Sequence, residues 1–204
     1  MAGSKVQIGV AILGAGASKR MGRPKLLLRW GRTSVIGHLL WQWRNLDARQ
    51  IALVSRPDDE RLADELDRLR FPKRNRIVNP LPQRGMFSSI VCAAKWTGWE
   101  PTLAVWAIVL GDQPHLRTPS LRTLLAFQRK HPDDICQPSF GGHGQHPVLL
   151  PRRSWIALQS TTAPTLKDFL ASTRVIECAI DDPRLTLDLD TPQDYTRLLR
   201  LTKK

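Results

Sequence analysis

Short apolar runs alternate with amphipathic helical patterns along nearly the whole chain, and this alternation limits the possible folds more than any other feature. Ala104–Leu110 is apolar throughout, which is typical of a strand buried on both faces. Ser34–Leu46 instead has its apolar residues at helical spacing. Strands that alternate with helices imply βαβ crossovers, so the pattern predicts an α/β fold with a mostly parallel sheet and helices on both faces.

The same pattern divides the chain into expected elements without a break between domains. Ser34 and Thr191 are expected to cap the helices that follow them, and the Gly-rich stretch from Ser139 to Pro147 is predicted to be a loop. The expected strands are Ile8–Leu13, Ile51–Ser55, Arg76–Val78, Ala104–Leu110, Pro147–Leu150 and Arg174–Ile180, and the expected helices are Ser34–Leu46, Asp58–Leu69, Met86–Trp96, Pro119–Lys130, Thr165–Leu170 and Pro192–Leu199. No linker or repeat divides the 204 residues, so we predict one domain over residues 1–204.

Composition excludes several classes of protein. Hydrophobic residues make up 42% and charged residues 24% of the chain, which is typical of a folded globular protein. No apolar run approaches the roughly 18 residues of a membrane-spanning helix, and Ile8–Leu13 is too short for a signal-peptide core. The cysteines Cys92, Cys136 and Cys178 are far apart, with no CxxC pair, so we expect free buried thiols in a reducing cytoplasm.

The charge is strongly positive and unevenly distributed. Lys and Arg number 31 against 18 Asp and Glu, a net charge of +13. The first acidic residue is Asp47, and before it stand Lys5, Lys19, Arg20, Arg23, Lys25, Arg29, Arg32 and Arg44. Such a region attracts polyanions, which leaves nucleic acid, anionic lipid or a small phosphorylated ligand as candidates. Nucleic acid is the weaker candidate, because no helix-turn-helix, zinc finger or aromatic sheet motif accompanies the charge.

A glycine-rich segment follows the first predicted strand directly. Gly14 and Gly16 would let backbone N–H groups approach a phosphate chain, and Arg20 and Lys25 could neutralise it. The segment is neither a P-loop, since it lacks Gly-Lys-Ser/Thr, nor a dinucleotide fingerprint, since Lys19 stands where a third glycine belongs. With no acidic residue nearby, the two cations are predicted to be free of local ion pairs. The alternative is a tight turn with surface cations.

Three acidic residues stand where a metal could be held. Asp112 ends the strand Ala104–Leu110 and would face the ligand-binding edge of the sheet, where a carboxylate suits Mg²⁺. Asp188 and Asp190 alternate on an extended segment, share a face and could add a metal ligand. The alternatives are that Asp112 caps the next turn and that Asp188 and Asp190 only balance a basic surface.

Two further segments could contact substrates. Gly85 stands beside a predicted helix start and could present backbone groups to a nucleotide base, with Ser89 on the first turn, although an ordinary helix cap would look the same. His143 and His146 lie three residues apart in the Gly-rich stretch with no third ligand nearby. We therefore predict a loop wall that touches an acceptor substrate rather than a metal site.

Taken together, these motifs resemble the MobA-like nucleotidyltransferase family, in particular its molybdenum cofactor cytidylyltransferase (MocA-type) branch. They occur in the family's order and span nearly the whole chain. The matching motifs are Leu13-Gly14-Ala15-Gly16-x-Ser18-x-Arg20-Met21-Gly22-x-Pro24-Lys25-Leu26-Leu27-Leu28, Gly85-Met86-x-x-Ser89, Gly111-Asp112-Gln113-Pro114, His146-Pro147-Val148-Leu149 and Asp188-x-Asp190-Thr191-Pro192-x-Asp194. The Asp-Gln-Pro triplet resembles the cytidylyltransferase branch more than the guanylyltransferases, in which Asp-Met-Pro is usual.

The resemblance implies a single Rossmann-like, glycosyltransferase-A-type domain that moves a nucleoside monophosphate, CMP from CTP, onto a phosphorylated pterin and releases pyrophosphate. It implies Mg²⁺ at Asp112 and Asp190, a possible molybdoenzyme or chaperone as partner, and no membrane association. Leu13, Gly14, Ala15, Gly16, Arg20 and Lys25 would hold the triphosphate, Gly85 and Ser89 would lie near the base, and His146 would contact the acceptor; Arg20, Lys25 and Asp112 would be catalytic.

The chemistry expected of such a site is mainly electrostatic. The acceptor phosphate attacks the α-phosphorus of the nucleotide, so the site must position two anions and offset their repulsion. No protein nucleophile is required, and the sequence contains no Ser-His-Asp or Cys-His constellation. Three alternatives remain open at this point: a related enzyme that uses GTP or another phosphorylated acceptor, a non-catalytic accessory protein, and a basic nucleic-acid-binding protein.

Overall fold

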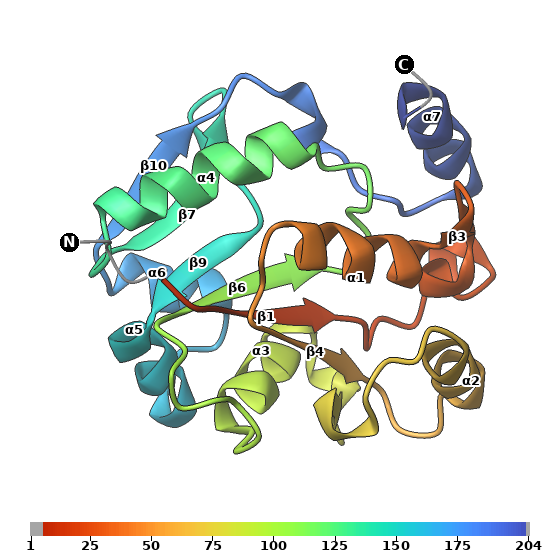
Figure 1. Cartoon of the computed structure of the whole chain (residues 1–204), viewed down its shortest axis with the longest axis horizontal. Helices are drawn as coiled ribbons and strands as arrows, with labels where there is room; N and C mark the ends of the chain where they lie inside the picture. Colours follow the sequence, from red (N-terminus) through yellow and green to blue (C-terminus); the bar gives the residue numbers. More distant parts are fainter. Residues whose placement is uncertain (1–5, 203–204) are drawn as a thin grey trace.

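The computed structural model describes residues 6–202 and has one central mixed β-sheet of eight strands (Figure 1). Lys5, counted above among the basic residues, lies outside the described part. The strands run in the order β10-β7-β9-β6-β1-β4-β5, and β8 pairs with β7. They are β1 (Ile8–Leu13), β4 (Gln50–Ser55), β5 (Arg76–Val78), β6 (Val105–Leu110), β7 (Ile135–Phe140), β8 (His143–Gly144), β9 (Val148–Pro151) and β10 (Val175–Ala179). A separate hairpin joins β2 (Arg29–Trp30) to β3 (Thr33–Ser34).

Helices cover both faces of this sheet. They are α1 (Val35–Asn45), α2 (Glu60–Arg68), α3 (Met86–Lys95), α4 (Thr118–Lys130), α5 (Arg152–Ala157), α6 (Leu166–Ala171) and α7 (Pro192–Thr202), with the short 3-10 turns η1 (Lys19–Met21), η2 (Lys25–Leu27), η3 (Lys73–Asn75), η4 (Pro82–Arg84), η5 (Leu158–Ser160) and η6 (Pro183–Thr186). Along β1, Val10 and Ile12 belong to the core that includes α1, α2 and α4, whereas Ala11 and Leu13 belong to the core that includes α3, α5 and α6. The alternation of side chains along a strand thus builds two apolar layers.

The direction of the strands confirms the predicted fold class. Strands β5, β4, β1 and β6 are all parallel, as are β7 and β10. Only β9 runs antiparallel within this path, against both β6 and β7. The chain is therefore an α/β domain of Rossmann-like type with a mostly parallel sheet.

Every predicted strand and helix is present, with ends that differ by three residues at most. One prediction is wrong: the stretch from Ser139 to Pro147 is not wholly a loop, because β7 continues to Phe140 and turns back into β8. Gly141 and Gly142 make this turn with φ of +60° and +78°. Sequence reasoning missed β7 because Pro138 interrupts its apolar pattern, and it also missed α5 and the β2–β3 hairpin.

The carboxyl ends of β1, β4 and β6 meet at one edge of the sheet, and α7 returns to that same edge (Figure 1). Gly111 allows β1 and β6 to converge there, since its N–H donates to Leu13 O at 3.0 Å and a Cβ atom would lie 2.6 Å from that oxygen. Leu189 N–H donates to Asp112 O at 2.9 Å, which ties the segment before α7 to the end of β6. This arrangement brings Asp188 and Asp190 beside Asp112.

Neither a membrane span nor a disulfide contributes to the described fold. None of the helices within residues 6–202 combines the length and the apolar character needed to cross a membrane. The three cysteines are free thiols, of which Cys136 and Cys178 are buried and Cys92 is half-buried. Burial raises the pKa of each, that of Cys136 to about 11, so these thiols are largely protonated at neutral pH.

A polar contact between two helices fixes the start of α1. The Ser34 hydroxyl accepts a hydrogen bond from Gly37 N–H at 3.1 Å, which confirms the predicted N-cap, and it donates to the carboxylate of Glu65 on α2. Arg68 contacts both oxygens of the same carboxylate, each at 2.6 Å. The hydrogen bond from Arg68 is the main reason that the pKa of Glu65 lies below its usual range, and the bond from Ser34 adds to the effect.

We expect Glu65→Gln to lower the free energy of unfolding at pH 7 by about 1 kcal/mol, the usual size of one helix cap or one hydrogen bond. Because the pKa of Glu65 is lower in the folded chain than in the unfolded one, its contribution is present above the ordinary carboxyl pKa. It is lost as pH falls through the lowered value. Urea unfolding at a series of pH values measures the difference, with exposed Asp64→Asn as the control. A difference that stays constant down to strongly acidic pH contradicts this assignment.

Candidate active site

A cavity of about 560 Å³ opens at the edge where β1 and β6 end. Its walls come from the segments that follow β1, β4 and β6 and from the start of α3, as expected for an open parallel sheet. The predicted site residues among its lining are Leu13, Gly14, Ala15, Gly16, Lys25, Gly85, Ser89 and Asp112. Arg20 and Asp190 instead line a smaller cavity of about 260 Å³, together with Asp188. His146 lines neither of these two cavities.

The two glycines of the loop after β1 have different roles. Gly14 N–H donates to Val54 O at 2.8 Å, and a Cβ atom there would lie 2.8 Å from the Leu26 side chain. Gly14 is therefore a packing residue whose N–H is already used, which corrects the expectation that it offers this group to a phosphate. At Gly16 a Cβ atom would meet nothing within 4 Å, so the backbone there is open to a ligand.

The rest of the loop is held in a defined shape by its own polar groups. Ser18 has a φ of +51°, and its hydroxyl accepts a hydrogen bond from Lys25 N–H at 3.2 Å. This contact joins the start of η1 to the start of η2. Ala15 and Gly16 donate no backbone hydrogen bond to another residue within 6–202, so their N–H groups are available to an anion.

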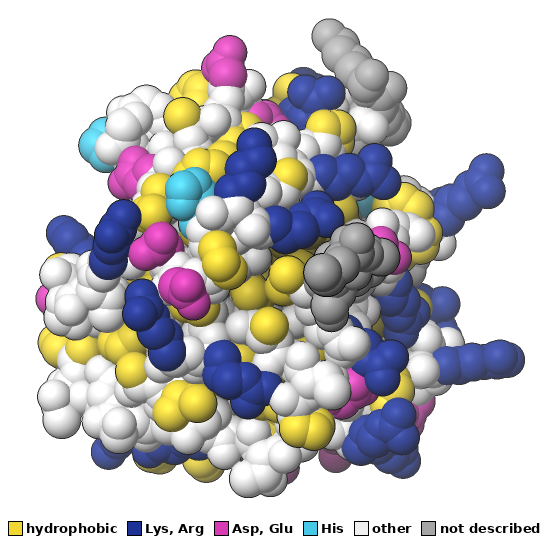
Figure 2. Space-filling view, turned by 60° about the vertical axis from the view of Figure 1, so that its left-hand side comes forward, with side chains coloured by type: hydrophobic (Ala, Val, Ile, Leu, Met, Phe, Trp, Pro, Cys, Tyr) yellow, Lys and Arg dark blue, Asp and Glu magenta, His cyan; other side chains and the backbone are white. Residues whose placement is uncertain are grey.

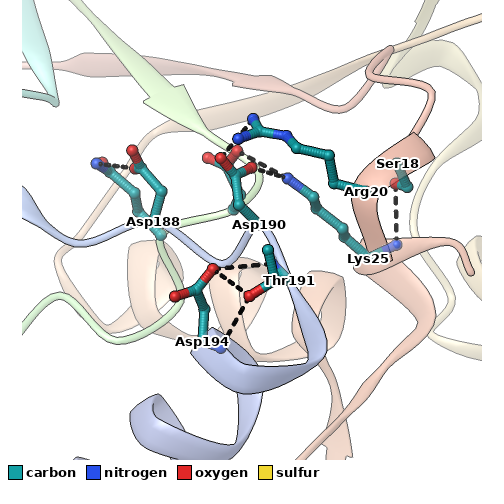
Figure 3. Close-up of polar contacts among 9 residues, drawn as sticks. Ser18, Arg20, Lys25, Asp188, Asp190, Thr191 and Asp194 are labelled. Atoms are coloured by element: carbon teal, nitrogen blue, oxygen red, sulfur yellow. Dashed lines mark hydrogen bonds and ion pairs between the residues drawn. The ribbon is translucent and has the colours of Figure 1, made fainter. Parts of the chain in front are cut away.

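Four charged side chains meet beside the cavity (Figure 3). Arg20 Nη2 lies 2.5 Å from Asp190 Oδ2, and Lys25 Nζ contacts Asp190 Oδ1 as well as Asp112 Oδ2, the latter at 3.5 Å. The sequence predicted no local ion pairs for Arg20 and Lys25, and both are instead paired with carboxylates that are distant in the sequence. Their partners come from the middle and the end of the chain, so inspection of neighbouring residues in the sequence could not find them.

The surroundings of Asp112 raise the pKa of its carboxyl group above the usual range. Burial is the main reason that its pKa is raised, Lys25 opposes this rise, and the negative charges of Asp188 and Asp190 add to it. Asp188 accepts a hydrogen bond from Gln113 Nε2 at 3.0 Å, so it is held close to Asp112. Because these surroundings disfavour the negative charge on Asp112, a cation bound beside the carboxylate would stabilise that charge.

The segment with Asp188 and Asp190 is fixed by the start of α7. Asp194 Oδ2 accepts hydrogen bonds from Thr191 N–H at 2.9 Å and from the Thr191 hydroxyl at 2.7 Å, and Thr191 Oγ1 accepts one from Asp194 N–H at 3.2 Å (Figure 3). This reciprocal pattern confirms Thr191 as the N-cap and makes Asp194 the partner of a capping box. The two residues therefore have a structural role, which leaves Asp188 and Asp190 for the site.

The donor set fits a divalent cation that is shared with a phosphorylated substrate. Asp112 and Asp190 supply carboxylate oxygens that converge on one ammonium group, that of Lys25. Within residues 6–202, no three His, Cys, Asp or Glu side chains are grouped so that they could hold a metal by themselves. Mg²⁺ is usually bound by one or two carboxylates together with substrate phosphates and water, which is the arrangement this pair allows.

The opposite wall of the cavity is built on a turn before α3. Gly85 has a φ of +86° and open space at its Cβ position, so it starts α3 without obstructing the cavity. Asn79 Nδ2 donates to Ser88 Oγ at 2.8 Å and to Ser89 Oγ at 3.0 Å, which fixes the first turn of α3. Ser89 is almost fully buried yet lines the cavity, so its hydroxyl proton can point toward a ligand.

Sequence reasoning missed several residues of this cavity. Arg56 lines it and is paired with Asp59 at 3.2 Å, and Gln83 and Met86 line the wall next to Gly85. Arg56 directly follows the strand Gln50–Ser55, so its position at a strand's carboxyl end was the signal that could have found it. Asn79 does not line the cavity but supports its wall, and this role could not be found because it depends on two serines of the next helix.

His146 lies within electrostatic reach of Asp188. Its Nδ1 is buried without a hydrogen-bond partner among the described residues. Burial is the main reason that its pKa is lowered, while the backbone of Ile108 and the charge of Asp188 oppose the shift. The imidazole is therefore neutral at pH 7, and it does not line the larger cavity.

Comparison with known families agrees with this geometry. The sequence profile of the MobA-like NTP transferase domain matches residues 10–176, and the chain belongs to this family. No curated protein gives a significant match. Family membership and the cavity with its cation and carboxylate cluster define the chain as a nucleotidyltransferase-type enzyme.

Solved structures with the same fold include proteins from bacteria and archaea. The Rv0371c homologue from Mycobacterium sp. strain JC1 is 25% identical, with a TM-score of 0.75 over 96% of this chain and 97% of that one. Rv0371c from Mycobacterium tuberculosis, described as a complex with manganese, is 24% identical, with a TM-score of 0.71 over 96% and 99%. The molybdopterin-guanine dinucleotide biosynthesis protein A from Archaeoglobus fulgidus is 15% identical, with a TM-score of 0.68 over 96% and 98%.

We expect Lys25→Ala to lower the free energy of unfolding at pH 7 by about 1–3 kcal/mol, because it leaves two partly buried carboxylates without their shared cation. Asp190→Asn should cost less in the Lys25→Ala background than in the wild type, since the two side chains interact directly. Urea unfolding of the four proteins measures this coupling, which should exceed about 0.5 kcal/mol. Additive effects would show that the contact contributes nothing to stability.

Proposed function

We propose that the chain transfers CMP from CTP to a phosphorylated molybdopterin-type cofactor and releases pyrophosphate. The observation that carries this proposal is the position of the Lys25 ammonium group between Asp112 and Asp190, at the wall of a cavity that begins with a glycine loop. Such a site contains both signs of charge that a metal–nucleotide complex needs: carboxylates for the cation and cations for the phosphates.

Each residue of the site has a distinct part in this proposal. The free N–H groups of Ala15 and Gly16, with Arg20 and Lys25, would bind the triphosphate, while Leu13 and Gly14 shape the loop. Asp112 and Asp190 would hold a divalent cation, Mg²⁺ in the first instance, which when bound offsets the negative charge of the phosphates. The exposed Arg20 can adjust to a ligand, whereas Lys25, whose side chain is only 15% exposed, is positioned in advance.

The proposed reaction needs no covalent intermediate with the protein. An oxygen of the acceptor phosphate attacks the α-phosphorus of CTP and forms a new P–O bond. The bond to the bridging oxygen of pyrophosphate breaks, and its electron pair leaves with pyrophosphate. Lys25 and Arg20 would stabilise the charge that moves to this leaving group, since contacts that strengthen in the transition state raise the rate.

The acceptor would enter from the side of Asp188 and His146. His146 is half-buried and neutral, and the exposed part of its ring would contact a polar heterocycle such as a pterin. The product would pass to a molybdoenzyme or its chaperone in the cytoplasm. GTP or another phosphorylated acceptor is the second candidate, because the printed name of the similar Archaeoglobus protein refers to a guanine dinucleotide.

Binding of nucleic acid has less support. On the face displayed in Figure 2, Lys and Arg side chains are separated by other side chains and do not form one continuous patch. A protein that follows a phosphate backbone concentrates its cations on one stripe or face. At the glycine loop, Arg20 and Lys25 are in contact with carboxylates instead, as in the binding site of a small charged ligand.

The direct test is to incubate the protein with each of the four NTPs, Mg²⁺ and a molybdopterin-type acceptor, and to measure pyrophosphate. We expect release that depends on the acceptor, with CTP as the preferred donor. Pyrophosphate formed only with GTP would show that GTP, and not CTP, is the donor. No release of pyrophosphate with any NTP would overturn the proposal.

We expect Asp112→Asn to keep the fold and to lower turnover by roughly two to three orders of magnitude, the usual cost of one preorganised electrostatic contact. Asparagine has nearly the same shape but neither charge nor the affinity of a carboxylate for a divalent cation. Steady-state kinetics over a range of Mg²⁺ measures the effect, with Asp64→Asn at an exposed position of α2, outside the carboxylate cluster and the cavity, as the control. Unchanged turnover would remove Asp112 from the site.

We expect CTP to bind more tightly than GTP. The wall formed by Gly85 and Ser89 offers one backbone segment and one small hydroxyl, which suits the compact edge of a pyrimidine. Isothermal titration with Mg²⁺ present gives both dissociation constants, and UTP separates a preference for cytosine from one for any pyrimidine. Tighter binding of GTP would contradict this prediction.

A further inference from the structure

A second cavity, of about 770 Å³, lies at the end of the sheet where β5 is the last strand. We call it the edge groove: it is bounded by β5, by the outer side of α3 and by residues 161–164 of the loop after η5. Gln159 Nε2 donates to Ala94 O at 2.9 Å and fixes η5 against α3. The volume is within the range of about 300–1,000 Å³ that is usual for sites of small organic ligands.

The walls of the edge groove are largely apolar. Phe87 and Trp96 of the α3 region line it, and Trp96 is supported by an edge contact with Trp99 at a ring-centroid distance of 5.1 Å. Val78 and Leu81 also line it and are 54% and 39% exposed, although both are large apolar side chains. A flat or apolar ligand body would cover surface that the fold leaves open to water.

The charge in the edge groove has a single sign. Its lining contains Arg76, Arg84 and Lys95 and no acidic residue. Arg76 is paired with Asp67 at 2.6 Å, but its Nε is buried without a hydrogen-bond partner in the described chain. Arg84 and Lys95 are exposed and form no ion pair with any residue in 6–202. An occupant that complements this surface carries negative charge at one end and an apolar group at the other.

One segment separates the edge groove from the nucleotide cavity. Gly85, Met86 and Ser89 line the cavity, whereas Arg84 and Phe87, which alternate with them along the chain, line the edge groove. Asn79 lines the edge groove and donates to the hydroxyl of Ser89 at 3.0 Å, so it touches a residue of each side. A ligand that presses on Phe87 or Asn79 acts on the turn that shapes the nucleotide cavity.

We propose that the edge groove is a regulatory site for a small organic anion with an aromatic or apolar body, and that its occupancy changes the affinity of the nucleotide cavity. The proposal that the groove binds such an anion rests on the groove alone. The proposal that it changes nucleotide affinity rests on the proposed function. Coupling requires that the effector bind one arrangement of residues 79–89 more tightly than another, and the Asn79 contacts provide the connection.

Half-buried Cys92 provides a readout confined to the edge groove, because it lines this groove while Cys136 and Cys178 are buried in the core. The probe is 8-anilinonaphthalene-1-sulfonate, an aromatic anion, with neutral N-phenyl-1-naphthylamine for comparison. Mass spectrometry follows modification of Cys92 by N-ethylmaleimide at neutral pH. We expect saturating sulfonate to slow this modification at least tenfold in the absence of any nucleotide.

Paired substitutions then test the charge. The double variant Arg84→Gln/Lys95→Gln should raise the dissociation constant of the sulfonate about tenfold and leave that of the neutral compound nearly unchanged. Arg122→Gln/Lys130→Gln removes the same charge from exposed positions of α4, on the opposite face of the sheet, and should change neither. An equal loss of sulfonate affinity in both double variants, or no protection of Cys92 from N-ethylmaleimide, would overturn the proposal that the edge groove binds the sulfonate.

Isothermal titration of CTP with and without saturating sulfonate tests the coupling. We expect the sulfonate to change the dissociation constant of CTP at least threefold. In Arg84→Gln/Lys95→Gln, the same sulfonate concentration should produce a smaller change. An unchanged constant with Cys92 protected would overturn the regulatory role and leave the proposed function standing. Protection of Cys92 in a protein that binds no nucleotide would instead overturn the proposed function and the coupling with it.

Discussion

The candidate active site depends on one interaction, the contact of the Lys25 ammonium group with Asp112 and Asp190. These residues come from the loop after β1, the end of β6 and the segment before α7, which are far apart in the sequence. Their meeting requires the parallel packing of β1 and β6, the close approach at Gly111 and the hydrogen bond from Leu189 N–H to Asp112 O. The fold therefore serves to bring one cation and two carboxylates to the same point.

The cluster of Arg20, Lys25, Asp112 and Asp190 contains two positive and two negative side chains, and a bound ligand could change how they pair. Asp188 adds a third negative charge nearby, and half-buried Asp112 has a raised pKa even though Lys25 is close. A metal–nucleotide complex would supply a cation to the carboxylates and phosphates to Lys25 and Arg20. Each carboxylate would then exchange one cationic partner for another, and each cation would exchange a carboxylate for a phosphate. Such an exchange needs little rearrangement, which is what electrostatic preorganisation requires. Family membership and this balance support the same conclusion from independent observations.

Much of the fold could be predicted from the sequence, because strand periodicity is a local property and the rule for ligand binding at open sheets is general. The apolar run at Ala104–Leu110 and the loop after Leu13 were enough to predict the ligand-binding edge of the sheet and several residues of the cavity, among them Gly16, Lys25 and Asp112. Contacts between distant segments could not be predicted. The pairing of Arg20 with Asp190, the use of the Gly14 N–H by Val54 and the role of Asn79 all depend on tertiary packing. Strand β7 was missed because Pro138 obscures its pattern.

A crystal structure with Mg²⁺ and a CTP analogue whose α,β-bridging oxygen is replaced by carbon tests the central claim most directly. We expect the metal to contact Asp112 and Asp190 and the phosphates to contact Lys25, Arg20 and the N–H groups of Ala15 and Gly16. Lys25 would then have left at least one of its carboxylate partners. A nucleotide bound elsewhere, with Lys25 still held between Asp112 and Asp190, would contradict the account.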